Sequence, residues 1–95
     1  MKERDLYSKF KLKMKARDPQ CWIYKIPDFL GGGKRPFDII LVSHGIPWAV
    51  EMKSKGKDAT LYQAYQLLDF ELAGGKTAIF KYGEDMDALV ENIAE

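Results

Sequence analysis

The 95-residue sequence lacks most of the features that mark secreted, membrane or thiol-based proteins. Its one cysteine, Cys21, allows neither an internal disulfide nor a multi-thiolate zinc site within one chain. No apolar run approaches the roughly 20 residues that a membrane span needs, and the charged start "MKERDLYSKFKLKMKARD" does not resemble a signal peptide. We therefore expect a protein of the reducing cytoplasm, with no membrane partner and with Cys21 as a buried thiol.

A strong net charge is also missing, but the charges are divided unevenly along the chain. The formal net charge is +1, yet residues 1–35 hold ten basic and four acidic side chains, whereas residues 36–95 hold five basic and ten acidic ones. The basic N-terminal part suits a polyanion such as nucleic acid. A solvated helix face without any partner remains the alternative that charge alone leaves open.

Apolar periodicity and turn residues predict the order α-β-β-β-α-β-α. We expect helices at 4–17, 60–73 and 84–95, strands at 21–26, 37–43, 46–53 and 76–82, and a glycine-rich loop at 27–36. Three consecutive strands suit antiparallel pairing, and a helical crossover before the fourth strand suits parallel pairing. The sequence thus predicts one layered α+β domain over residues 1–95, with a mixed sheet.

Two further expectations concern single elements. Leu61, Ala64, Leu68 and Leu72 mark the second helix, which Gly74-Gly75 ends. Trp22 and Trp48 are expected in the core.

The most informative stretch is "RPFDIILVSHGIPWAVEMKSK", residues 35–55. A two-residue turn at His44-Gly45 pairs strand positions whose numbers sum to 89, so that Asp38 faces Glu51. Lys53 projects from the same face as Glu51, because side chains alternate along a strand. The apolar runs beside these residues are typical of strands covered on both faces, and charges at their ends indicate a site at the edge of the sheet.

Such a cluster has a definite chemistry. Two adjacent carboxylates repel, and one of them is protonated unless a cation lies between them. Ligation by carboxylate oxygens is what Mg²⁺, Ca²⁺ or Mn²⁺ prefers. Taken alone, the Glu-x-Lys pattern is also that of an ordinary solvent-facing strand.

An ordered set of motifs resembles the PD-(D/E)xK nuclease superfamily, and more closely the small stand-alone virus-type replication-repair nuclease (VRR-NUC) domains of phages and bacteria. The motifs are "ERDLYSKF", "KIPD", "RPFDIILV", "AVEMK", "LYQAYQLL" and "AGGKTAIF", which together cover nearly the whole chain. The resemblance implies a restriction-endonuclease-like core, α-β-β-β-α-β, followed by a C-terminal helix.

The superfamily's proline usually directly precedes its aspartate, whereas Phe37 stands between Pro36 and Asp38 here. The literal Pro27-Asp28 opens a glycine loop and does not face Glu51, so Asp38 is preferred.

The resemblance implies a DNA endonuclease that depends on Mg²⁺ or Mn²⁺, without a small-molecule cofactor. The implied substrate is branched DNA such as a four-way junction, and the protein is expected as a homodimer in a bacterial or phage-infected cell. Asp38 and Glu51 would hold the metal with the Met52 carbonyl. Lys53 would orient the attacking hydroxide or stabilise the oxyanion of the transition state. Two further residues match family positions: Glu3 as an acidic ligand and Gln63 as a site glutamine, with Gln66 as the alternative to Gln63.

Basic residues flank the cluster and are expected to contact phosphates rather than bases. They are Lys34, Arg35, Lys55 and Lys57. The resemblance also implies that Lys25 on the first strand approaches the phosphate, with an ordinary surface lysine as the alternative. Two other functions remain open at this stage: a non-catalytic nucleic-acid-binding or replication accessory module on the same fold, and a small interaction domain whose basic helix is incidental.

Overall fold

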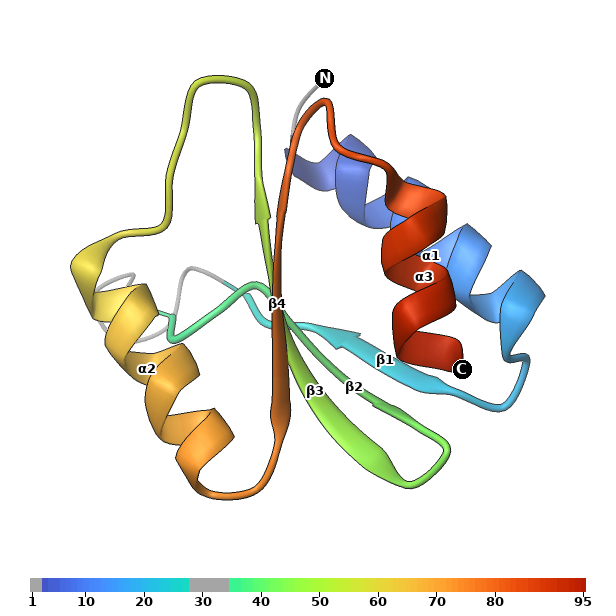
Figure 1. The fold of residues 1–95 in the computed structure, drawn as a ribbon. Coiled ribbons are helices and arrows are strands. Elements are labelled where there is room, and N and C mark those ends of the chain that lie inside the picture. The colour runs from blue at the N-terminus through green and yellow to red at the C-terminus, as the bar shows by residue number, and fades with distance from the viewer. Residues whose placement is uncertain (1–2, 28–34) are drawn as a thin grey trace.

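The computed structural model describes residues 3–27 and 35–95. The elements are α1 (Glu3–Arg17), β1 (Trp22–Lys25), β2 (Ile39–Ser43), β3 (Ile46–Lys53), α2 (Leu61–Leu72), β4 (Lys76–Lys81) and α3 (Met86–Ala94). The sheet lies between α2 on one side and the α1–α3 pair on the other (Figure 1). The fold class is therefore α+β in three layers, and the predicted order of elements is confirmed.

The four strands form one mixed sheet in the order β1-β2-β3-β4. The first three strands pair antiparallel, and β4 returns through α2 to run parallel to β3. Ser43 pairs with Ile46, and the register continues to the last pair of β2 and β3, so positions sum to 89 as predicted. His44 and Gly45 have φ values of 53° and 76°, the two positive values that a type I′ hairpin turn requires.

The second strand differs from the prediction at its start, because β2 begins at Ile39 rather than at residue 37. Asp38 meets β3 through its side chain: its Oδ2 accepts a hydrogen bond of 2.7 Å from the Met52 amide. The carboxylate thus takes the place of a backbone acceptor in the ladder, and Pro36 has no N–H to extend the pairing further. Asp38 lies just beyond the strand, still at the predicted open end of the hairpin.

The main core lies between the sheet and the α1–α3 pair. Leu6, Phe10 and Met14, spaced four residues apart along α1, are buried there, and Cys21 is buried with them as expected. Within the described part of the chain, no helix combines the length and the apolar character that a membrane crossing demands.

A smaller cluster joins α2 to the other face of the sheet. Phe37, Ala49 and Leu67 are buried there, and Phe70 packs edge-on against Phe37 with ring centroids 5.5 Å apart. Phe37, the residue that interrupts the usual Pro-Asp sequence, is thus a contact that holds α2 against the sheet.

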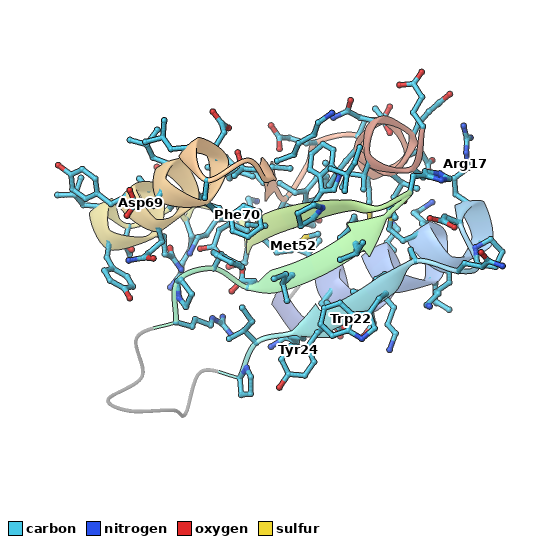
Figure 2. All side chains as sticks on the ribbon, turned by 90° about the horizontal axis from the view of Figure 1, so that it is seen from below. Arg17, Trp22, Tyr24, Met52, Asp69 and Phe70 are labelled. Carbon is cyan, nitrogen blue, oxygen red and sulfur yellow. The ribbon has the colours of Figure 1, made fainter. Side chains whose placement is uncertain are left out.

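Trp22 does not lie in the core, although Trp48 does. Trp22 is 54% exposed, and its ring stacks on Tyr24 at a centroid distance of 5.9 Å. Trp22 pairs with Val42 and so shares the α2 side of the sheet. Figure 2 shows Trp22 and Tyr24 beside β1, across the width of the sheet from α2, which does not extend over them.

The packing of α2 also differs from what its apolar spacing suggests. The helix forms as predicted, but Leu61, Leu68 and Leu72 are exposed, and Ala64 is exposed with them. The helix instead turns Gln63 and Leu67 toward the sheet.

The Phe37 contact can be tested through stability. Phe37→Ala should lower the free energy of unfolding by about 3 kcal/mol, because it removes a buried ring and leaves a cavity beneath α2. Leu12→Ala is the control, because Leu12 is 74% exposed on α1, and it should change stability by less than about 0.5 kcal/mol. Urea unfolding followed by circular dichroism measures both, and equal values for the two variants would contradict the packing of α2 through Phe37.

Candidate active site

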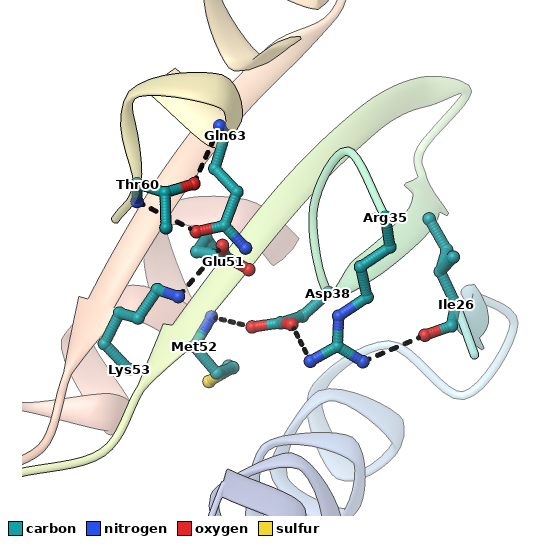
Figure 3. A network of polar contacts seen from close by, with 8 residues as sticks. All are labelled: Ile26, Arg35, Asp38, Glu51, Met52, Lys53, Thr60 and Gln63. Atoms are coloured by element: carbon teal, nitrogen blue, oxygen red, sulfur yellow. Dashed lines mark hydrogen bonds and ion pairs between the residues drawn. The ribbon is translucent and has the colours of Figure 1, made fainter. Parts of the chain in front are cut away.

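The charged residues of the hairpin gather on the α2 side of the sheet, where β3 ends (Figure 3). Side chains alternate along β3, so Glu51 and Lys53 share the face of Ala49, whereas Val50 and Met52 enter the main core. Glu51 and Lys53 are buried beneath α2. The structure therefore brings together the cluster that the hairpin register predicts.

Asp38 is held by contacts on both of its oxygens. Its Oδ2 accepts from the Met52 amide, and its Oδ1 lies 2.6 Å from the guanidinium of Arg35. Arg35 also donates a hydrogen bond of 3.2 Å to the carbonyl of Ile26. Charge-assisted contacts of this kind fix the orientation of a carboxylate, so Asp38 presents a defined geometry to the cluster.

Glu51 is the most unusual group of the site. It is 0% exposed, and neither of its carboxylate oxygens has a hydrogen-bond partner among the described residues. The ammonium of Lys53 lies 3.4 Å from Oε2, an ion-pair distance. Burial raises the pKa of Glu51 from 4.5 to about 8, the neighbouring Asp38 carboxyl group raises it too, and Lys53 opposes the shift. Without an added cation, Glu51 therefore holds a proton at neutral pH.

Gln63 reaches the same cluster from α2. It is buried, and its side chain ends beside Glu51 (Figure 3). Gln63 also closes a capping box with Thr60: its Oε1 accepts from the Thr60 amide at 3.0 Å, and its own amide donates to the Thr60 hydroxyl at 3.2 Å. Gln63 thus fixes the start of α2, which is a structural role in its own right, while Gln66 is half-buried one turn further along.

The donor set fits a hard divalent cation. Two buried Glu51 oxygens without hydrogen-bond partners are what a cation would satisfy, since buried charges in proteins are paired or coordinate metals. The Met52 amide points toward Asp38, and the N–H and C=O of one residue in an extended strand point to the same edge, so the Met52 carbonyl faces that edge too.

The described residues contain no group of three or more His, Cys, Asp or Glu side chains placed to hold a metal. Asp38 and Glu51 are therefore the two candidate carboxylate ligands that the described residues offer at this site. The predicted third acid, Glu3, begins α1, but its side chain lies outside the described part of the structure.

The predicted phosphate-binding residues fall into different places. Lys55 and Lys57 are exposed on the loop that follows β3. Arg35 is paired with Asp38, and Lys34 lies outside the described residues. Lys25 pairs with Ile39, which faces the main core, so the structure does not bring Lys25 into the cluster.

Sequence reasoning missed two contributors to the site. Thr60 had a local signal, because "TLYQ" at 60–63 fits the capping-box pattern of Thr followed three residues later by Gln. The ion pair between Arg35 and Asp38 had only a weak sequence signal, which is the spacing of three residues between them.

Comparisons with known proteins agree with this architecture. No family model matches the sequence, and no curated protein matches it closely. Among solved structures, a VRR_NUC domain superposes with a TM-score of 0.62 and 19% identity, over 88% of this chain and 92% of its own. Hjc from Archaeoglobus fulgidus, a Holliday junction resolvase from an archaeal hyperthermophile, superposes with a TM-score of 0.51 and 18% identity, over 87% of this chain and 68% of its own. The fold that the sequence resemblance predicted is thereby confirmed.

The buried carboxyl group makes stability depend on pH and on metal. Between pH 4.5 and about 8, Glu51 is ionised in the unfolded chain but protonated in the folded one, so the folded state binds more protons and stability falls as pH rises. Thermal unfolding in EDTA should therefore show a declining melting temperature across this window, and Mg²⁺ or Mn²⁺ should restore it at pH 8.

Glu51→Gln is the matched variant, because it keeps the shape of the side chain and cannot ionise. In this variant the melting temperature should fall less between pH 4.5 and about 8, and Mg²⁺ or Mn²⁺ should no longer raise it. Differential scanning calorimetry measures both effects. A metal response that survives in Glu51→Gln would place the cation elsewhere.

Proposed function

We propose that this protein is a divalent-metal-dependent DNA endonuclease. The observation that carries the proposal is the fully buried Glu51 carboxyl group, which lies between Asp38 and Lys53 and has no hydrogen-bond partner among the described residues. Burying an ionisable group in this way is costly in a purely structural role, whereas it suits a site that holds a cation and so neutralises phosphate charge. The likeness of the fold to a VRR_NUC domain and to a junction resolvase supports this reaction class.

Each residue of the cluster has a distinct task in phosphodiester hydrolysis. Asp38 and Glu51 would hold Mg²⁺ or Mn²⁺ together with the Met52 carbonyl, and Glu3 is proposed as a further acidic ligand. When bound, the cation would acidify water and neutralise charge on the phosphate. Arg35 and the Met52 amide orient Asp38.

Lys53, whose side chain is only 10% exposed, stabilises the negative charge that develops in the transition state. The buried Gln63 is proposed to orient the reacting water through its amide group.

For the substrate, we propose branched DNA, such as a four-way junction. The support comes from the Hjc structure, which is named as a Holliday junction resolvase. Cutting two symmetric strands requires two sites, and we therefore propose a homodimer. DNA would approach along the loop after β3, where Lys55 and Lys57 are exposed.

The central test compares Lys53→Ala with Glu51→Gln. Lys53→Ala should cut about 100- to 1,000-fold more slowly and still bind Mn²⁺, because an ammonium is not a metal ligand. Glu51→Gln should lose both cleavage and metal binding. Single-turnover cleavage of a four-way junction, a linear duplex and a single strand, combined with Mn²⁺ titration calorimetry, separates these effects.

Lys9→Ala is the control, since Lys9 is exposed on α1, across the sheet from the cluster, and it should cut at the normal rate. Normal cleavage by Lys53→Ala would refute the active site. Metal-independent DNA binding without cleavage by the wild type would instead select the accessory-module function.

The DNA path gives a second prediction. Replacing both Lys55 and Lys57 by alanine should weaken binding to all DNA sequences alike and reduce the slope of log affinity against log salt by about 2, because each phosphate contact contributes about 0.9. Fluorescence anisotropy across a salt series measures this slope. The control pair, Lys9 and Lys11 on α1, should leave the slope unchanged, and the reverse result would move the DNA to α1.

A further inference from the structure

The outer face of α2 carries an apolar stripe, which we define as Leu61, Tyr65, Leu68 and Leu72. These side chains are 72%, 60%, 50% and 76% exposed. Their spacing of four, three and four residues places them along one line of the helix surface, as at the a and d positions of a coiled coil. The stripe lies opposite Gln63 and Leu67, which face the sheet.

A helix that is apolar on both faces is normally covered on both. DNA is a poor candidate for the outer face, because residues 58–75 contain no lysine or arginine in a chain that has 15 of them, and phosphate binding depends on such cations. The chemistry of the stripe therefore fits an apolar protein surface.

The stripe is its own complement. When two copies of α2 pack antiparallel about a two-fold axis, positions whose numbers sum to 133 face each other, so Leu61 meets Leu72 and Tyr65 meets Leu68. The axis passes between residues 66 and 67. All four apolar side chains thus find apolar partners in a symmetric contact, which is what an isologous interface requires.

Charge selects the antiparallel orientation. The acidic residues of α2, Asp69 and Glu71, both lie near its C-terminal end. A parallel pair would bring four carboxylates together, which is unfavourable. An antiparallel pair places them beside the N-terminal turn of the partner helix, where the helix dipole favours negative charge.

We propose that a second copy of this chain covers the stripe, forming a two-fold dimer through antiparallel packing of α2. The inference rests on the homodimer of the proposed function and names its contact surface. Since Gln63 lies on the inner face of each α2, the two clusters would lie on opposite sides of the helix pair. Two helix diameters separate them by on the order of 20 Å, so each cluster could take its own strand.

The oligomeric state tests this surface directly. In sedimentation velocity of DNA-free protein in EDTA, the wild type should dimerise with increasing concentration, and the dissociation constant should lie in the micromolar range because one helix face is a small interface. Leu68→Glu should raise that constant at least about 100-fold, since symmetry places two unpaired carboxylates in the contact.

Leu12→Glu is the matched control, because Leu12 is 74% exposed on α1, close to the 76% of Leu72 on α2, and it should dimerise like the wild type. Circular dichroism confirms that each variant is folded. A monomeric wild type throughout the micromolar range, or an unchanged dimer in Leu68→Glu, would overturn the proposal.

Chemical cross-linking tests the orientation. With a short bismaleimide, the double variant Leu61→Cys/Leu72→Cys should form covalent dimers, whereas Leu61→Cys alone should not. The wild type serves as the reference for Cys21, which is 2% exposed. Efficient cross-linking of Leu61→Cys alone would indicate a parallel pair and overturn the antiparallel arrangement.

These readouts are independent of catalysis. Lys53→Ala should dimerise normally although it cuts about 100- to 1,000-fold more slowly, and Leu68→Glu should bind Mn²⁺ normally although its dimer is weakened. Loss of the dimer proposal would therefore leave the nuclease proposal intact, and the converse also holds.

Discussion

The burial of the Glu51 carboxyl group beside Asp38 is the constraint around which the site is built. The sheet is covered on both faces at this point, so Glu51 has no access to water and needs either a proton or a cation. Each unit of the pKa shift corresponds to a free-energy cost of about 1.4 kcal/mol for ionising Glu51. The carboxyl group stays buried at that cost only because the surrounding side chains pack around it. Phe37 and Leu67 supply that packing by fixing α2 above the strand end, and the capping box of Thr60 and Gln63 fixes where α2 begins.

The hairpin could be predicted from the sequence because its geometry follows from two rigid rules. A two-residue turn sets which positions pair, and alternation along a strand sets which side chains share a face. Once His44-Gly45 is identified as the turn, the positions of Asp38, Glu51 and Lys53 follow by counting, and the observed register agrees. The start of β2 did not follow, since the exchange of a backbone acceptor for the Asp38 side chain depends on the site itself.

Burial was harder to predict because it depends on what covers a surface rather than on the surface alone. The spacing of Leu61, Leu68 and Leu72 correctly indicates a helix, but α2 has a second apolar face, and periodicity does not say which of the two meets the sheet. Trp22 shows the same limit, because β1 is an edge strand and α2 does not extend over it. The pairing of Arg35 with Asp38 depends on the path of the loop before β2, for which the sequence offers no local rule.

Charge is distributed unevenly over the surface of the molecule. Residues 58–95 hold two basic and eight acidic side chains, and α2 carries acids but no basic residue, so its surface is unfavourable for a polyanion. The acidic side chains of α3 lie beside the basic α1, as the Lys13–Asp87 ion pair shows. Three lysines lie just before residue 58, at the end of β3 and on the loop that leads to α2: Lys53, Lys55 and Lys57. In the proposed nuclease, these cations would attract the DNA to the end of the sheet where Asp38 and Glu51 meet. In the proposed dimer, the inner face of α2 would contact the proposed catalytic cluster and its outer face would contact the second copy. This one helix would then fix the position of each active site relative to the other.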